Sequence, residues 1–180
     1  MLVLRTYLEM RSPTELRAPA RPAGADVRLE RLERCTAAAY RELYRLVGGD
    51  YHWRDRLAWS DERLDEHLAR PEIEVWVLRD ADDTAGTPLG YFELARSDDG
   101  DVEIAYFGLA RRAHGRGLGG WMLGEAVRRA WDSGARRVHL NTCTLDSPAA
   151  LPNYLARGFV ATRTETYETN IPEPEGLRTS

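Results

Sequence analysis

The sequence predicts an α/β protein in which a mixed, mostly antiparallel sheet is flanked by helices. Two observations predict this class. Between residues 72 and 109, short polar segments separate apolar runs, which indicates antiparallel hairpins. From residue 102 onward the pattern becomes strand, glycine-rich turn, helix and strand, which is typical of one parallel βαβ crossover. With 180 residues, 43% of them hydrophobic, the chain can bury a sizeable core, and we expect one domain over residues 1–180.

The first third of the chain is predicted to hold one strand followed by two helices. Leu2–Met10 can form a strand, and the proline-containing stretch up to residue 26 is expected to be a loop. Apolar residues recur at three- and four-residue steps over residues 29–47, which indicates an amphipathic helix that Gly48 ends. Ser60 suits the N-cap position of a second helix, which we expect to reach about residue 69.

The rest of the chain is predicted to alternate strands with two more helices. Strands are expected at residues 72–79, 89–95, 102–109, 137–142 and 159–167. One helix is expected from residue 121 to about 133. Another lies between Ser147 and Gly158, and because Pro152 lacks an amide hydrogen, this helix is expected to begin late or to be distorted. Residues 171–180 are expected to form a loose tail.

The composition argues against several classes of function. A formal net charge of -4 disfavours nucleic acid as the main partner, because phosphate backbones bind a clustered basic surface. No apolar run approaches the roughly 18 residues of a membrane span, so we expect no membrane partner. Cys35 and Cys143 are far apart, which predicts a reduced, cytoplasmic protein without a metal site. Every basic residue is arginine, so no lysine can act in catalysis.

The run from Phe107 to Gly120 has the strongest chemical signal. Four glycines lie there between an apolar strand and an amphipathic helix, at positions 115, 117, 119 and 120. Glycine permits turns that point successive N–H groups into one hollow, and the helix N-terminus adds unpaired donors. The turn therefore predicts a phosphate or pyrophosphate site. Three arginines can reinforce it: Arg111, Arg112 and Arg116. A tight turn whose glycines only permit close packing is the alternative.

Two other phosphate-binding motifs contain similar glycines. The glycines of residues 115–120 also satisfy the G-x-G-x-x-G dinucleotide pattern, and Asp146 follows the next strand. An NAD(P)-dependent oxidoreductase would need several consecutive βα units, whereas here hairpins come first and one crossover follows. A P-loop is excluded because the chain contains no lysine.

The segment His114-Gly-Arg-Gly-Leu-Gly119 resembles the Q/R-x-x-G-x-G/A signature of the GNAT superfamily of acetyl-CoA-dependent N-acetyltransferases. About thirty residues later, the stretch from Ser147 to Phe159 resembles the family pattern N-x-x-A-hydrophobic-x-x-Y-x-x-x-G-F, with Tyr154 at the tyrosine position. His114 and Ser147 depart from the usual residues. The similarity spans roughly residues 89–166 and implies a GNAT-like sheet whose βαβ crossover holds the cofactor.

The resemblance implies a binding site for acetyl-CoA. In similar proteins the diphosphate of coenzyme A rests on the amides of the glycine turn, and the pantetheine arm lies along the preceding strand. The residues that the resemblance assigns to the cofactor are Phe107, Gly108, Leu109, Ala110, His114, Gly115, Arg116, Gly117, Leu118, Gly119, Gly120, Ser147 and Tyr154.

The transfer to an amine requires a base, because an amine with a pKa near 10.4 is about 99.9% protonated at pH 7. Glu103 on the central strand is the first candidate, acting directly or through a water, because the base of similar proteins often lies on this strand. Glu93 on the neighbouring strand is the second. His52 and His139 suit the role by side-chain type. Tyr154 matches the family tyrosine that protonates or hydrogen-bonds the departing thiolate.

The acceptor is expected opposite the cofactor, against a connector rich in aromatic rings. The residues predicted to line the acceptor site are Tyr51, His52, Trp53, Trp59 and Asn141. The rings of the connector fit an ordinary core equally well. A small molecule or a peptide can supply the amine, and a homodimer is common among similar proteins. The alternative function is a non-catalytic module that binds CoA or acyl-CoA.

Overall fold

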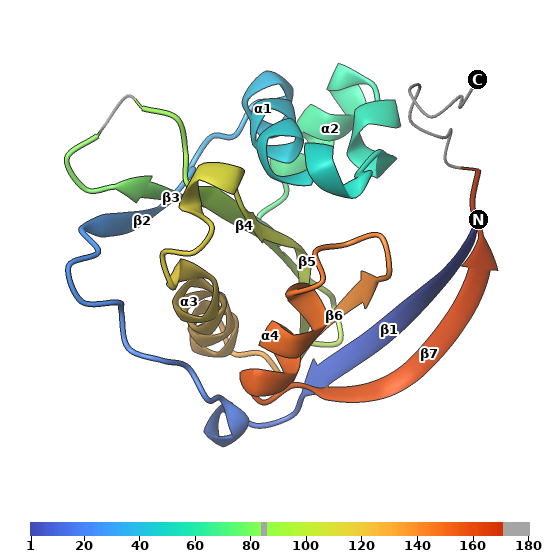
Figure 1. Ribbon diagram of the computed structural model, residues 1–180. Coiled ribbons are helices and arrows are strands. Elements are labelled where there is room, and N and C mark those ends of the chain that lie inside the picture. The colour runs from blue at the N-terminus through green and yellow to red at the C-terminus, as the bar shows by residue number, and fades with distance from the viewer. Residues whose placement is uncertain (84–85, 171–180) are drawn as a thin grey trace, which may run out of the picture.

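One mixed sheet forms the centre of the protein, as the sequence predicts (Figure 1). The computed structural model describes residues 1–83 and 86–170. Within these residues, seven strands are arranged in the order β2-β3-β4-β5-β6-β1-β7. Their bounds are β1 Leu2–Met10, β2 Val27–Arg31, β3 Ile73–Asp80, β4 Gly90–Arg96, β5 Asp101–Leu109, β6 Arg137–Cys143 and β7 Val160–Glu168. β5 and β6 are parallel, and all other neighbours pair antiparallel.

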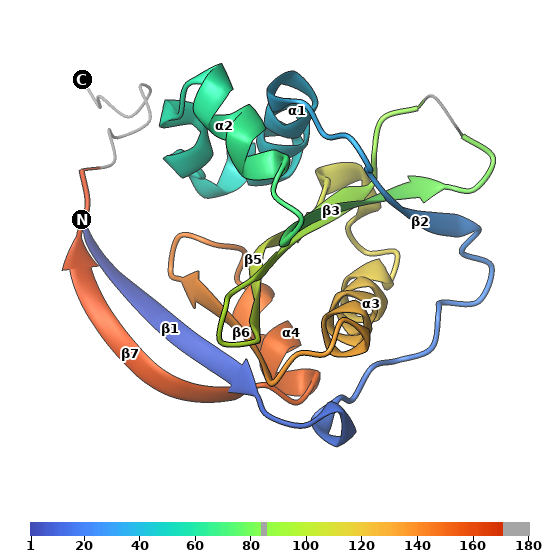
Figure 2. The same cartoon turned by 180° about the vertical axis from the view of Figure 1, so that it is seen from behind.

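Helices cover the two faces of this sheet (Figures 1 and 2). On one face lie α1 (Ala37–Gly48) and α2 (Asp61–Leu68). On the other face lie α3 (Leu118–Asp132) and the short α4 (Ala150–Ala156). Side chains alternate along each strand, so the sheet contributes to two separate cores. In β4, for example, Tyr91 belongs to the core beneath α1, whereas Phe92 belongs to the core beneath α3.

The first helix is shorter than predicted, and the prediction that it starts near residue 29 is wrong. Residues Val27–Arg31 form β2, an edge strand that pairs antiparallel with β3. The amide of Leu32 continues this pairing by donating to the carbonyl of Val75 at 2.9 Å. The helix begins at Ala37, where Thr36 caps it by accepting from the amide of Ala39. Pairing with β3 therefore outweighs the helical spacing of residues 29–36.

The other predicted elements are present, with shifts of a few residues at their ends. Ser60 caps α2 by accepting from the amide of Arg63, as expected. α4 begins late, at Ala150, so Pro152 lies in the first helical turn, where no intrahelical donor is needed. The predicted loose tail, residues 171–180, lies outside the described residues.

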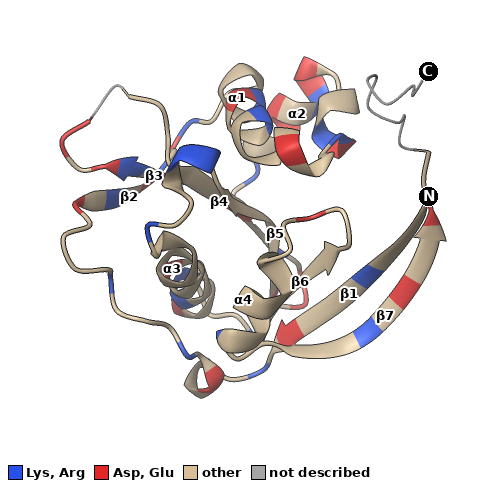
Figure 3. Cartoon of the chain, viewed as in Figure 1, with Lys and Arg blue, Asp and Glu red and all other residues tan. Residues whose placement is uncertain are grey.

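The N-terminal strand has a position that the sequence does not reveal. β1 lies between β6 and β7 and pairs antiparallel with both, so it extends the sheet beyond the crossover. β1 and β7 swing away from the helices (Figure 1), and acidic and basic residues are interspersed along them (Figure 3). No helix among the described residues is long and apolar enough to cross a membrane.

Candidate functional site

The site begins where two parallel strands separate. β5 and β6 pair from Asp101 opposite Arg137 to Glu103 opposite His139. Beyond this point β5 continues along β4, and β6 continues along β1. A bulge leaves Ala105 unmatched between two paired residues of β5, which bends that strand. A cavity of about 1060 Å³ occupies the fork, a volume suited to a large cofactor together with part of a substrate.

The glycine turn forms one end of the cavity. Gly115 and Gly117 adopt φ angles of 75° and 71°, in the left-handed region that glycine enters without strain. Gly117 is the N-cap residue of α3 and has no side chain to cap it, and no other described side chain caps the first amides of the helix. Gly115, Gly117, Gly119 and Gly120 all line the cavity. This end can therefore hold an anion through backbone amides.

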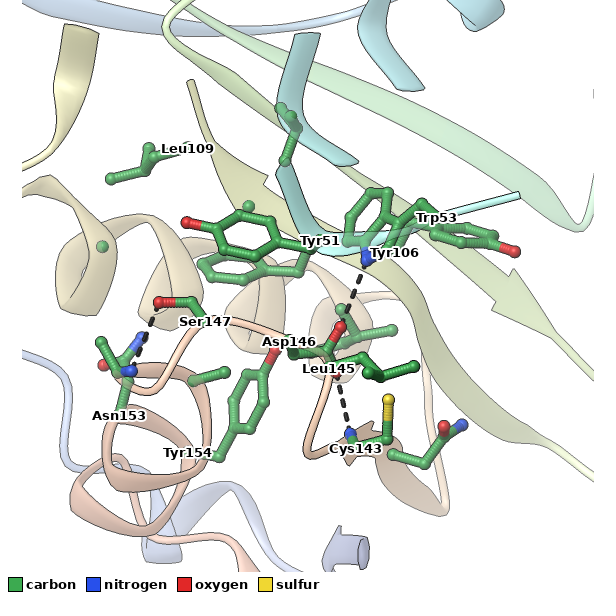
Figure 4. A pocket seen from close by; sticks show the side chains of 18 of the residues that line it. Tyr51, Trp53, Tyr106, Leu109, Cys143, Leu145, Asp146, Ser147, Asn153 and Tyr154 are labelled. Carbon is green, nitrogen blue, oxygen red and sulfur yellow. Dashed lines mark hydrogen bonds between the residues drawn. The ribbon is translucent and has the colours of Figure 1, made fainter. Parts of the chain in front are cut away.

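Tyr154 projects into the cavity from α4 (Figure 4). The residue is 7% exposed, and its ring contacts Phe107 and Phe159 edge-on, with centroids 6.3 Å away in each case. Burial raises the pKa of Tyr154, and the nearby charge of Asp146 raises it further. The phenol is therefore protonated at neutral pH and available as a hydrogen-bond donor.

A hydrogen-bonded pair ties the two walls of the cavity together (Figure 4). Trp53, on the connector between α1 and α2, donates its indole N–H to Asp146 Oδ1 at 3.2 Å. The other carboxylate oxygen of Asp146 accepts from the hydroxyl of Thr142 at 2.7 Å and the amide of Cys143 at 2.9 Å. The Trp53 ring also packs against Tyr106, with centroids 5.1 Å apart. Asp146 thus orients both the connector and the loop after β6.

Glu103 lies at the fork itself, as the last residue of β5 that pairs with β6. Its side chain is partly buried and lines the cavity. No hydrogen bond or ion pair joins the Glu103 carboxylate to any other residue that the structure describes. The carboxylate is therefore free to accept a proton from a group in the cavity.

Glu93 occupies a different environment, behind the cavity. It is 0% exposed and does not line the wall. Arg56 Nη2 donates to Glu93 Oε1 at 3.0 Å, His67 Nε2 lies 2.8 Å from the same oxygen, and Tyr40 donates its hydroxyl to the other. Burial alone would raise the pKa of Glu93, but the contacts with His67, Arg56 and Tyr40 outweigh it and lower the pKa. This carboxylate holds neighbouring elements together and is poorly placed to reach a substrate amine.

The cavity brings together most of the predicted site residues. Those in its wall are Tyr51, His52, Trp53, Glu103, Phe107, Gly108, Leu109, His114, Gly115, Gly117, Leu118, Gly119, Gly120, Asn141, Ser147 and Tyr154. His139 lies instead beside a smaller neighbouring cavity, which Glu103 and Asn141 also line.

Besides His139, four of the residues predicted for the cofactor, the base or the acceptor lie outside the wall. One is Glu93, for the reason given above. Ala110 is 1% exposed, and its amide donates a hydrogen bond to the carbonyl of Leu89. Arg116 turns away and pairs with Asp80 at 2.9 Å. Trp59 packs against the guanidinium groups of Arg56 and Arg63, which lie 4.1 Å and 3.9 Å from the centroid of its ring.

The sequence did not single out several residues of the wall. They are Arg5, Pro19, Tyr44, Arg56, Tyr106, Asn153 and Arg157. Tyr106 could have been found, because it precedes Phe107 on the strand that lines the cofactor site. Asn153 and Arg157 lie inside the motif from Ser147 to Phe159, at positions where it specifies no residue type, and Arg56 lies in the aromatic connector. Arg5, Pro19 and Tyr44 come from segments outside the motifs. Among the residues that the structure describes, no group of His, Cys, Asp and Glu could hold a metal ion.

A comparison with protein families finds one match. The family described as "Acetyltransferase (GNAT) family" matches residues 40–159, which include the fork, the glycine turn and Tyr154. No curated protein matches the chain at a significant level.

Solved structures resemble this fold at low sequence identity. A GCN5-related N-acetyltransferase from Kribbella flavida matches with a TM-score of 0.62 and 20% identity, over 91% of this chain and 56% of that one. A GCN5-related N-acetyltransferase from Sphaerobacter thermophilus gives 0.63 and 18%, over 91% and 50%. An aminoglycoside acetyltransferase from an uncultured soil sample gives 0.61 and 15%, over 86% and 99%. The chain thus spans about half the length of the first two proteins, and these likenesses show the fold alone.

Proposed function

Since the chain belongs to the GNAT family of acetyltransferases, we propose that it is an N-acetyltransferase that uses acetyl-CoA as its co-substrate and a primary amine as its acceptor. Membership of the family supports acyl transfer in general. The observation that carries the finer proposal is the convergence of the glycine turn, Glu103 and Tyr154 on one cavity.

In the proposed reaction the amine attacks the thioester carbon directly. The amine arrives mostly as an ammonium ion, which first gives one proton to Glu103, directly or through a water, and Glu103 passes it to solvent. The C–N bond then forms, the C–S bond breaks, and the second proton of the attacking nitrogen passes to Glu103 by the same route. Glu103 then loses this proton to solvent. The products are an N-acetyl compound and coenzyme A, whose sulfur leaves as a thiolate.

Tyr154 stabilises this thiolate by donating a hydrogen bond. A thiol has a pKa of about 8.5 and a phenol of about 10, so full proton transfer from tyrosine is already unfavourable in water. Burial raises the pKa of Tyr154 further, which widens the gap. A hydrogen bond to the developing charge needs no transfer and is strengthened in a site that excludes water.

The acceptor amine is proposed to enter on the side of Tyr51, His52 and Trp53, across the cavity from α4. Tyr44 and Tyr106 extend this wall of rings, which suits an acceptor with an apolar body. One of the similar structures is an aminoglycoside acetyltransferase, so the same fold also occurs in a protein that is named for a polar amine. Small molecules and peptides therefore both belong in a search for the acceptor. We place the reaction in the cytoplasm, because both cysteines are free thiols.

The test is an acetyl-transfer assay with a panel of amines that includes aminoglycosides, polyamines, amino acids and peptides. Release of free thiol from acetyl-CoA is measured together with the mass of the product. We expect an added mass of one acetyl group on at least one amine. Tight binding of acetyl-CoA without transfer to any amine would instead favour the non-catalytic module. Absence of binding would reject the proposed function.

A further inference from the structure

Arg157 is the arginine that the fold places beside the glycine turn, although no motif points to it. It follows α4 directly, as its C-cap residue, and lines the cavity. Its guanidinium lies against the first turn of α3, because a Cβ atom built on Gly120 would come within 2.1 Å of Arg157 Nη1. The Nε atom of Arg157 is buried and has no hydrogen-bond partner among the described residues.

The charge of Arg157 is also uncompensated. Basic residues mark the segment that leads into α3 (Figure 3), and two of these pair with carboxylates. Arg111 lies 3.0 Å from Asp50, and Arg116 lies 2.9 Å from Asp80. In the part of the chain that the structure describes, no carboxylate lies within 4.0 Å of the Arg157 guanidinium.

The position of the Arg157 guanidinium beside the N-terminus of α3 is electrostatically unfavourable unless an anion binds there. The N-terminus of α3 carries the positive end of the helix dipole, and a cation placed there is repelled. An anion between the two would be attracted by both. The cavity runs past both groups, since Gly117, Gly119, Gly120 and Arg157 all line it.

Gly120 provides the room for this contact. Glycine is unfavourable inside a helix, so its presence at the third position of α3 requires a reason. Any other residue there would place a Cβ atom where the end of the Arg157 side chain lies. Gly120 therefore permits the guanidinium to approach the first turn of α3.

We propose that Arg157 is a cofactor-binding residue whose guanidinium binds the diphosphate of the acyl-CoA, opposite the amides of the glycine turn. This inference rests on the proposed function, because it takes the ligand to be a CoA thioester. It assigns to Arg157 the electrostatic role that the sequence suggested for Arg116.

The first test measures binding of coenzyme A by calorimetry to the intact protein and to Arg157→Gln. We expect the dissociation constant to rise about 10- to 100-fold, as is typical for loss of a charged hydrogen bond. Dephospho-CoA retains the diphosphate but lacks the 3′-phosphate, so its affinity should fall by the same factor. Arg128→Gln, which removes one positive charge from the outer face of α3, is the control and should leave both affinities unchanged.

The second test uses Gly120→Ala, which displaces the end of the Arg157 side chain without removing its charge. Because the clashing atom is the end of a flexible side chain, we expect the melting temperature to be maintained or raised while affinity for coenzyme A falls. In the double variant Gly120→Ala/Arg157→Gln the two losses should not add. Additive losses would mean that the new methyl group blocks the ligand itself.

The outcomes separate this inference from the proposed function. If the intact protein binds no coenzyme A, the proposed function fails. If it binds coenzyme A and Arg157→Gln binds equally well, the role of Arg157 is wrong and the proposed function stands. A loss with coenzyme A but not with dephospho-CoA would also overturn the inference, because it would assign Arg157 to the 3′-phosphate.

Discussion

Tyr154 and Glu103 differ in what surrounds their polar atoms, and this difference suits opposite roles. The tyrosine is almost fully buried, and its raised pKa keeps the phenol protonated. The glutamate lies where β5 and β6 begin to separate, partly exposed and without a described ion-pair partner. A protonated donor and a free carboxylate are therefore present in one cavity, as proton removal and thiolate stabilisation require.

Replacing the tyrosine should separate binding from turnover. For Tyr154→Phe we expect kcat to fall about 100-fold, because a donor to the leaving thiolate is lost. Affinity for acetyl-CoA should change little, since the ring and its contacts with Phe107 remain. Steady-state thiol release and calorimetry measure the two effects. Tyr91→Phe, at a buried tyrosine outside the cavity wall, is the control, and full turnover in Tyr154→Phe would contradict the assigned role.

The glutamate should affect the rate without affecting the fold. Glu103→Gln is expected to lower kcat/KM for the amine about 100-fold, because the amide cannot accept the proton. Its melting temperature should stay close to that of the intact protein, since no described ion pair is lost. The rate of the variant should recover at high pH, where more of the amine is already deprotonated. An unchanged rate at neutral pH would remove Glu103 from the reaction.

Sequence motifs located the cofactor end of this site but not its charges. The glycines and Tyr154 were found because their spacing is fixed by one crossover and the helix that follows. Whether Glu93, Trp59 or Arg116 faces the cavity depends on which partners the fold brings to each side chain. Arg116 forms an ion pair with Asp80, whereas the guanidinium of Arg157 lies at the glycine turn. The sequence had suggested Arg116, and not Arg157, as a cation of the anion site.

Glu93 joins α1, α2 and the intervening connector to β4. Its partners Tyr40, His67 and Arg56 come from these three segments in turn. Removing one partner from a buried ion pair leaves an uncompensated charge, which is strongly destabilising. The wall of rings on the acceptor side therefore depends on a carboxylate that is not itself in the wall.

Glu93→Gln should consequently lower the free energy of unfolding, by about 2–4 kcal/mol at neutral pH. The activity of the protein that remains folded should stay within a few-fold of normal, in contrast to Glu103→Gln. Urea unfolding monitored by tryptophan fluorescence, together with the transfer assay below the unfolding transition, checks both. A loss of turnover without a loss of stability would restore Glu93 as a base.

The same substitution has a definite pH dependence. Because the pKa of Glu93 is lowered in the folded protein, its contribution is fully present above the unfolded-state pKa of about 4.3. That contribution is lost as the pH falls through the lowered, folded-state pKa. The difference in stability between the intact protein and Glu93→Gln should therefore be constant near neutrality and shrink below about pH 4. A difference that grows with acidification would contradict the assignment.

The sequence predicted a helix or strand correctly where the local preference of its residues agrees with their tertiary packing. α2 has its Ser60 cap, and the late start of α4 follows from Pro152. β2 was missed because its residues also fit the helical spacing that leads into α1, and an unpaired edge of β3 decides between the two. No local pattern places β1 between β6 and β7, because strand order depends on distant pairing.

The site exists because the central sheet divides into two branches after the last pair of β5 and β6. β5 and β6 are held together at one end by three paired residues and are held apart beyond it by different neighbours, β4 and β1. The backbone of β5 from residue 104 onward therefore has one edge facing the cavity. A pantetheine arm placed there could hydrogen-bond to this edge while the diphosphate reaches the glycine turn.

Hydrogen–deuterium exchange with and without saturating coenzyme A tests whether the ligand lies in the fork between β5 and β6. We expect slower exchange of amides in residues 104–109 and 115–120 when coenzyme A is bound, with little change in the outer strand β2. Coenzyme A that binds without protecting either segment would contradict this placement, because the ligand would then lie outside the fork between β5 and β6.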